Sequence, residues 1–357
     1  MQKFPTLSRD FVTERLTPPT GRVRLVIDTD TANEIDDQFA LAWALFSPDR
    51  LDVLAVTAEP FSFAHHLPAL HAAEAAILEG TTLPEHMVGG FQGWLDRLHR
   101  QGRRVADLNL AGPAEGMEMS YHEILRVYDA CAIPHAGRVF RGADRYMTDA
   151  DTPVVTDAAT AIVDLAKSAG GPLYIAALGC VTNIASAFLM APEIIRDVVV
   201  VWTSGYPSSA PHSNSPSLNL VQDLPASRIL FDCGVPHVYL PGYHVGAQLK
   251  VSLPEIERFV QGRGAVGDLL HHLFTQNPLH HMFALDDTAR RTWVIWDIIN
   301  IAWLINPDWV PTYMTTSPRL DNALIWQKDP ARHPMREAHD VQRDEIFLNF
   351  FDSLGLQ

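Results

Sequence analysis

The sequence has little cysteine and few basic residues. Cys131, Cys180 and Cys233 are the only cysteines in 357 residues, and no two of them have CxxC spacing. This argues against a disulfide framework and a structural zinc site, and it predicts a reducing, cytoplasmic location. There are 27 Lys and Arg against 42 Asp and Glu, which gives a formal charge of −15. A chain this acidic is a poor partner for nucleic acid.

Long hydrophobic runs are also missing. No stretch reaches the roughly 18 apolar residues of a membrane span, and charges interrupt the N-terminal segment, so we expect neither a signal peptide nor a membrane partner. The glycine-rich phosphate-binding P-loop motif does not occur. The chain is nevertheless 47% hydrophobic and 19% charged, which is enough apolar bulk for one large globular domain or two modest ones.

Short apolar, β-branched runs alternate with longer helical patterns along the chain. Strands are predicted at 23–27, 51–57, 173–177, 198–202 and 237–240, and helices at 36–46, 157–168, 183–190 and 224–232. Strands that are apolar throughout and flanked by helices predict an α/β fold with an open, mostly parallel sheet and helices on both faces. Thr182 and Asn183 would cap the third helix. Functional sites in such folds lie at the carboxyl ends of the strands.

The segment from about residue 66 to 119 breaks this alternation. It carries His-rich and Gly-rich pieces, a helical pattern at 94–101, and loops around Pro84 and Pro113. We interpret it as an insertion or lid within one domain that spans residues 1–357, because no other composition shift or internal repeat divides the chain.

Four aspartates follow the first predicted strand within ten residues. Asp28 and Asp30 end the strand on one side, since strand side chains alternate, and Asp36 and Asp37 begin the helix, where its dipole favours carboxylates. Any one of them could be a helix cap or a solvated strand end. Four like charges this close need a cation or a polar ligand to offset them. Because all the donors are oxygens, calcium or magnesium suits the cluster better than zinc.

The run Asp28-Thr-Asp30 followed by Asp36-Asp37 resembles the DxDPGxDD signature of the nucleoside hydrolase family, the inosine–uridine-preferring N-ribohydrolases. Three later blocks are similar to family segments in the same order: 174–185 to the segment ending in GPLTNIA, 217–228 to EFN…DPEAAR, and 296–307 to HD…LINP. Without the inserted region, the resemblance covers about residues 22–310. It implies the Rossmann-like fold of that family.

The loop between Asp30 and Asp36 has five residues where the family pattern has three, and it lacks the Pro-Gly turn. Asn33 and Glu34 then have no counterpart and could make extra polar contacts near the metal. A gapless register would instead put Ala32 at the second aspartate, with Asn33 supplying the missing oxygen. We prefer the longer loop because it keeps both strand-end carboxylates.

The resemblance implies a calcium site. Asp30 and Asp37 would be ligands, together with the backbone carbonyl of Leu178 and the carboxylate of Asp297, and water and ribose hydroxyls would complete the shell. Such an oxygen set fits calcium. A calcium-bound water would attack the substrate, with Asp30 as the general base.

The resemblance also implies the substrate and the reaction. Asp36 and Asn219 would bind ribose hydroxyls, and Asp28 would brace the site from behind. The reaction would be hydrolysis of the N-glycosidic bond of a ribonucleoside or related N-riboside to free base and ribose, through a transition state with positive charge on the ribose ring. The context would be purine and pyrimidine salvage by a homodimer or homotetramer.

Two substitutions depart from the family pattern. Ser217 stands in place of the acidic residue of the EFN block, and Trp296 in place of the histidine before the late aspartate. A serine stabilises positive charge less than a carboxylate does. Trp296 cannot protonate a leaving base near neutral pH, although its indole can donate a hydrogen bond or stack on a base.

The acid that protonates the leaving base must then come from elsewhere. The chain has 16 histidines, and His244 is our first candidate because it follows a predicted strand end. His212, His280 and His281 are the other candidates. Tyr206, in a Gly-Tyr-Pro loop, is a candidate for the base pocket.

Two other functions compete with hydrolysis. A catalytically impaired nucleoside- or sugar-binding protein of the same fold would explain Ser217 and Trp296. A metal-dependent phosphatase is a weaker alternative: Asp28-Thr-Asp30 is similar to the start of a DxDx(T/V) nucleophile motif, but Ala32 stands where Thr or Val is required, and the Asp36-Asp37 pair has no role there.

Overall fold

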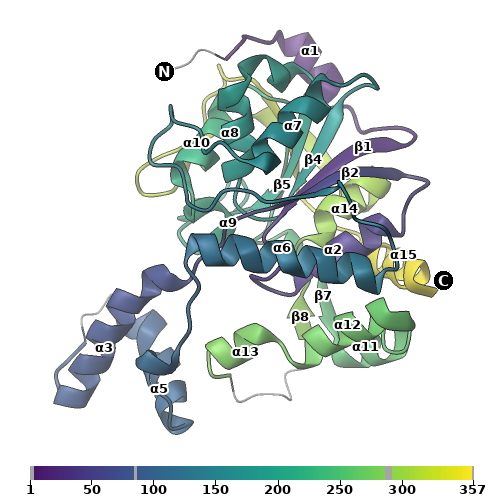
Figure 1. Ribbon diagram of the computed structural model, residues 1–357. Helices are drawn as coiled ribbons and strands as arrows, with labels where there is room; N and C mark the ends of the chain where they lie inside the picture. The colour runs from purple at the N-terminus through teal and green to yellow at the C-terminus, as the bar shows by residue number, and fades with distance from the viewer. Residues whose placement is uncertain (1–3, 84–86, 286–291, 356–357) are drawn as a thin grey trace.

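A parallel sheet forms the centre of the computed structural model, which describes residues 4–83, 87–285 and 292–355 (Figure 1). Its eight strands have the order β3-β2-β1-β4-β5-β6-β12-β9, and every neighbouring pair is parallel except β12 and β9. The strands are β1 (Val23–Thr29), β2 (Leu51–Ala58), β3 (Val139–Phe140), β4 (Leu173–Ala177), β5 (Val198–Ser204), β6 (His237–Pro241), β9 (Thr312–Thr316) and β12 (Pro334–Ala338).

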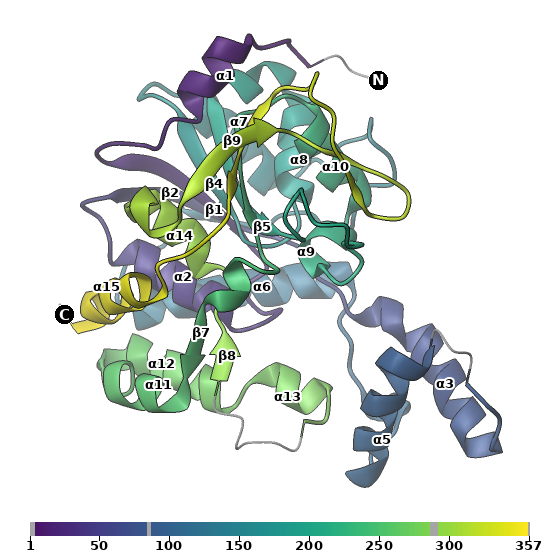
Figure 2. The same cartoon turned by 180° about the vertical axis from the view of Figure 1, so that it is seen from behind.

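Helices cover both faces of the sheet (Figures 1 and 2). On β5, Val199 and Val201 belong to one hydrophobic core, and Val200 and Trp202 to the other, because successive side chains point to opposite faces. The first core is packed by α2 (Asp36–Leu45), α6 (Pro113–Ala130), α14 (Ile298–Ile305) and α15 (Arg343–Gly355); the second is packed by α7 (Asp157–Lys167), α8 (Thr182–Met190) and α10 (Leu224–Asp232). The predicted fold class is confirmed.

The remaining elements lie around this body. They include α1 (Arg9–Arg15), α3 (Leu67–Glu79), α5 (Gly93–Arg100), α9 (Leu218–Val221), α11 (Leu253–Phe259), α12 (Gly264–Thr275), α13 (Pro278–Met282), the antiparallel β7–β8 pair (Lys250–Ser252 and Thr292–Val294) and the β10–β11 pair (Arg319–Leu320 and Trp326–Gln327). None of the helices in the described part of the chain is long and apolar enough to cross a membrane.

Helices α3 and α5 form an arm that projects from the body (Figures 1 and 2). The arm has its own small core, which includes Leu70, Trp94 and Leu98. It docks onto the end of α13, where Trp94 Nε1 donates a hydrogen bond to the carbonyl of Met282 at 2.9 Å. Helix α6 begins inside the range predicted for the insertion, but it packs on the body, since Met117 belongs to the first core.

Candidate active site

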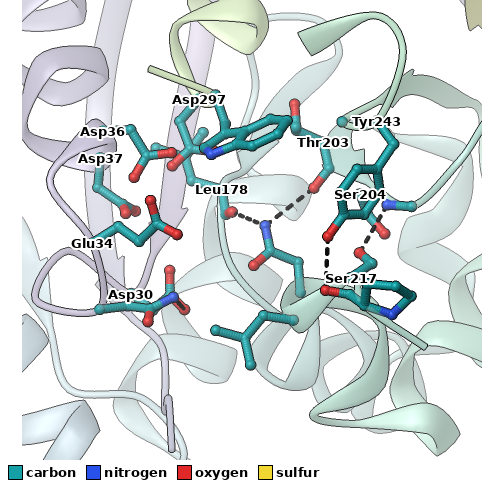
Figure 3. Close-up of a pocket in the computed structure, with 17 residues that line it drawn as sticks. Asp30, Glu34, Asp36, Asp37, Leu178, Thr203, Ser204, Ser217, Tyr243 and Asp297 are labelled. Atoms are coloured by element: carbon teal, nitrogen blue, oxygen red, sulfur yellow. Dashed lines mark hydrogen bonds between the residues drawn. The ribbon is translucent and has the colours of Figure 1, made fainter. Parts of the chain in front are cut away.

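A pocket lies at the carboxyl ends of β1, β4, β5 and β6, which is where the sequence analysis expected a site (Figure 3). Residues between 30 and 37 line one side, and residues 203–205, 216–219 and 242–243 line the other. Leu178 and residues 296–297 complete the lining. Four strand ends and the starts of α2, α9 and α14 therefore meet at this point.

The loop from β1 to α2 carries the acidic side of the pocket. Asp30 comes directly after β1, and the backbone N–H of Asn33 turns back onto the carbonyl of Asp30 at 2.7 Å. The Asn33 side chain donates a second hydrogen bond, of 3.1 Å, to the Asp30 carboxylate. Helix α2 then begins with Asp36 and Asp37 in its first turn. The strand-end and helix-start carboxylates were predicted to meet at one point. Asp30, Asp36 and Asp37 do so.

The carboxylates of Asp36, Asp37 and Asp297 lie close together. Each is buried, and one oxygen from each lies within 4.8 Å of the others. Asp297 reaches this cluster because it directly precedes α14. Asp30 and Glu34 line the same pocket without belonging to that three-membered group. This set of buried oxygen donors suits a hard cation.

Burial and mutual repulsion raise the pKa values of these acids. Burial places the pKa of Asp30, Asp36 and Asp297 well above the usual range, and the neighbouring carboxylates raise it further. Burial raises the pKa of Asp37 to about 6 and that of Glu34 to about 7. Because each unpaired charge is costly here, protons or a cation must offset part of the charge.

The Leu178 carbonyl is already hydrogen-bonded. Asn219 Nδ2 donates to it at 2.5 Å and to the carbonyl of Thr203 at 3.2 Å. The next residue, Gly179, lies against Asp30, and a Cβ there would be 2.8 Å from the Asp30 carboxylate. The end of β4 is thus built to bring its backbone close to Asp30.

Asp28 lies behind the pocket and does not line it. It is fully buried, and its Oδ1 accepts hydrogen bonds from Thr57 Oγ1 at 2.5 Å and Asn183 Nδ2 at 3.0 Å. The prediction that Thr182 and Asn183 cap α8 was wrong. Val181 occupies the N-cap position without a side-chain bond, while Asn183 ties Asp28 to the carbonyl of Ala58.

The position of Asp28 bears on the register of the aspartate motif. Asp30, Asp36 and Asp37 line the pocket with Asp28 behind them, which is the arrangement expected for the longer loop. Ala32 does not line the pocket. The two residues without a counterpart, Asn33 and Glu34, both do.

The two departures from the family pattern, Ser217 and Trp296, both line the pocket. Ser217 Oγ accepts a hydrogen bond of 2.8 Å from the backbone N–H of Gly205, so it holds the loop after β5. The Trp296 ring stands edge-on to the Tyr243 ring, with centroids 5.8 Å apart. Tyr243 also lines the pocket, which the sequence did not predict; its only signal was its position two residues after β6.

Tyr206 and His244 lie one layer outside the pocket. The Tyr206 ring stacks on that of Tyr243 with centroids 4.5 Å apart, so Tyr243 and not Tyr206 faces the cavity. His244 is exposed, has a positive φ of 71°, and packs edge-on against Tyr206. The backbone turn after β6 therefore places His244 outside the lining, and His212 packs against the same tyrosine.

Comparisons with known proteins find related sequences. The family model described as inosine-uridine preferring nucleoside hydrolase matches residues 25–341. The non-specific ribonucleoside hydrolase RihC of Salmonella enteritidis is 27% identical over 293 residues, which is 81% of this chain and 80% of that protein.

Solved structures show the same fold. A purine-preferring ribonucleoside hydrolase from Gardnerella vaginalis is 19% identical with a TM-score of 0.65, over 93% of this chain and 98% of that one. The plant nucleoside hydrolase PpNRh1 is 17% identical with a TM-score of 0.64, over 94% and 99%.

Proposed function

The chain belongs to the inosine-uridine preferring nucleoside hydrolase family, and from this premise we propose that it hydrolyses the N-glycosidic bond of a ribonucleoside or related N-riboside to free base and ribose. One observation carries the proposal: carboxylates from two distant segments, residues 30–37 and Asp297, converge in one pocket at the strand ends. Such a pocket stabilises the positive charge that develops on the ribose ring as the C1′–N bond breaks.

We propose calcium as the metal, with Asp30, Asp37, Asp297 and the carbonyl of Leu178 as its ligands. The buried oxygen donors support this assignment, and so does the proximity of Asp37 to Asp297. When bound, the ion would orient the ribose diol and make a water molecule more acidic. Asp36 lies in the same carboxylate group, so its assignment to a ribose hydroxyl depends on how it turns once substrate is present.

The protein's own groups would carry the remaining steps. Asp30 would accept the proton of the attacking water, and its neighbour Asn33 would hold its carboxylate in place. Asn219 would exchange its bond to the Leu178 carbonyl for a ribose hydroxyl. The Trp296 ring would pack on the base.

A panel of purine and pyrimidine nucleosides tests the proposal. With calcium present, we expect release of ribose and free base, abolished by a chelator and restored by calcium. Asp30→Asn should lower kcat by about 10²-fold or more, since a general base contributes that much. The structural control is Asp49→Asn, because Asp49 is exposed and outside the pocket.

A binding protein that has lost turnover is the second candidate, and two observations favour it. The Ser217 hydroxyl already accepts a hydrogen bond from the loop after β5, and Trp296, at the position of the family's histidine, has no titratable proton. Tight nucleoside binding without release of base from any member of the panel would establish it and overturn the hydrolase. A cytoplasmic location, a role in salvage and assembly as a homodimer or homotetramer remain predictions.

A further inference from the structure

We propose that Glu34 makes this pocket select N-ribosides whose base carries a fixed positive charge, such as a pyridinium or an N7-alkylated purine. The inference rests on the proposed hydrolase function and specifies its substrate class. Glu34 belongs to the longer β1–α2 loop and has no counterpart in the family's aspartate pattern, so the selectivity would be a property of this chain.

The first argument is charge. Five carboxyl groups line the pocket: Asp30, Glu34, Asp36, Asp37 and Asp297. The described lining residues include no Lys, Arg or His. A divalent cation would offset two of the five formal charges, and the carboxylates that stay ionised beside it would attract a positively charged ligand.

The second argument is the position of Glu34. Its Oε2 accepts a hydrogen bond of 3.3 Å from the indole N–H of Trp293, which belongs to β8. Figure 3 shows the Glu34 carboxylate pointing into the pocket, between the carboxylates of Asp37 and Asp30. The bond to Trp293 links the carboxylate to a strand outside its own loop. The carboxylate is therefore held in a fixed position from which it can contact a ligand.

The third argument is an unused acceptor beside Glu34. Asn33 is 6% exposed, lines the pocket and donates its Nδ2 to Asp30, but its Oδ1 has no partner. A buried acceptor without a partner costs free energy, so it favours a ligand with an N–H donor. The carboxamide of a pyridinium base or the amino group of a purine would supply one.

The chemistry of departure suits the aromatic part of the lining. When the C1′–N bond of a cationic base breaks, its electron pair moves to the ring nitrogen, and the base leaves as a neutral molecule. The water oxygen bonds to C1′, and the water's proton goes to Asp30. No proton has to reach the leaving base, and the aromatic rings of Trp296 and Tyr243, which line the pocket, would attract the positive ring before cleavage.

A matched pair of substrates tests the inference. 7-Methylguanosine, below the pKa of its N1–H, differs from guanosine by one methyl group and one positive charge. We would measure kcat/KM for both with the calcium-loaded wild type and with Glu34→Gln. For each protein we would divide kcat/KM for 7-methylguanosine by kcat/KM for guanosine. Comparing this ratio between wild type and variant cancels the intrinsic lability of 7-methylguanosine. We expect the preference for 7-methylguanosine, which is this ratio, to fall about tenfold in the variant.

Glu123→Gln is the matched control, because Glu123 accepts a hydrogen bond from Gln38 close by but does not line the pocket. It should leave the preference unchanged. An unchanged preference in Glu34→Gln, or an equal loss on both substrates, would overturn the inference and leave the hydrolase standing. Wild-type protein that cleaves neither nucleoside would instead overturn the proposed function. Calorimetry with calcium on Glu34→Gln shows whether the variant binds calcium as tightly as wild type does. A loss of calcium affinity would also count against the inference.

Discussion

Asp37 is the residue on which the metal assignment depends most. It lies in the buried carboxylate group with Asp36 and Asp297, and Thr29 donates a hydrogen bond to it from the end of β1. No other aspartate of the cluster combines both features: contact with a second segment of the chain and support from the strand below.

We predict that Asp37→Ala lowers calcium affinity by about two orders of magnitude or more, because the number of charged ligands governs the affinity of such sites. The fold should survive, since the change removes one of several repelling charges, and Thr29 keeps Thr31 as a neighbour at 3.2 Å. Calorimetry with calcium measures the first effect and circular dichroism the second. Unchanged affinity would show that the ligand assignment is wrong; the exposed Asp49→Ala variant should bind as wild type does.

The sequence located the aspartates of the pocket but not the direction of each side chain. Asp28 and Asp30 were expected on one side because strand side chains alternate, yet β1 ends at Thr29 and the chain then turns. Asp28 therefore stays behind the sheet end while Asp30 enters the pocket. Tyr243 escaped notice for the same reason: only the local turn decides that it, and not His244, faces the cavity.

At the scale of elements, unbroken apolar runs determined which strands of the sheet could be predicted. The strands β1, β2, β4, β5 and β6 were all expected, within two residues at either end, because the centre of a parallel sheet is apolar throughout. β3, β9 and β12 were not. β3 has only two residues, and β12 is mostly buried, but Arg336 and Glu337 interrupt its apolar pattern. β9 (TYMTT) is an edge strand with exposed Tyr313 and Met314, so no buried periodic pattern marks it.

The arm formed by α3 and α5 is attached to the rest of the chain through Trp94. Its ring lies 4.8 Å from that of Phe283, centroid to centroid, and its N–H binds the Met282 carbonyl. Arg97 adds a bond of 2.9 Å to the Phe283 carbonyl. Because its apolar core is small, the arm should open independently of the sheet.

We predict that Trp94→Ala lowers the free energy of opening of the arm by about 3 kcal/mol, the lower end for a buried Trp to Ala change. Hydrogen exchange should then accelerate in α3, α5 and α13 and stay unchanged in β4 and β5. Leu78→Ala on α3 is the control, since Leu78 is 57% exposed. Equal acceleration in the central strands would show that the arm and the sheet unfold together.

At the scale of the whole molecule, the acidic pocket couples stability to pH. Glu34 and Asp37 have pKa values of about 7 and about 6 in the folded protein, and unfolded carboxyl groups have values of about 4. The folded state therefore holds more protons than the unfolded state in this range. The free energy of unfolding of the metal-free protein must fall as pH rises through these values.

Buried histidines act in the opposite direction at lower pH. Burial lowers the pKa of His237 to about 3 and that of His333 to about 4 in the folded protein. The unfolded chain takes up protons on these histidines once the pH falls below about 6.5, so they lower the free energy of unfolding only below that pH. The range from about pH 6.5 to about pH 8 therefore reports mainly on the carboxylates.

We predict that Tm of the chelator-treated protein falls between about pH 6.5 and about pH 8, while the increase in Tm on adding calcium grows over the same range. Calcium and protons compete for the same oxygens, so each proton lost makes the ion bind more tightly. Thermal unfolding at several pH values, with chelator and with calcium, measures both trends. In Glu34→Gln the fall without metal should be shallower, because one group with a raised pKa is gone. A metal-free Tm that rises with pH, or a calcium effect that shrinks, would mean that the carboxylates of the pocket are already ionised and paired without the ion.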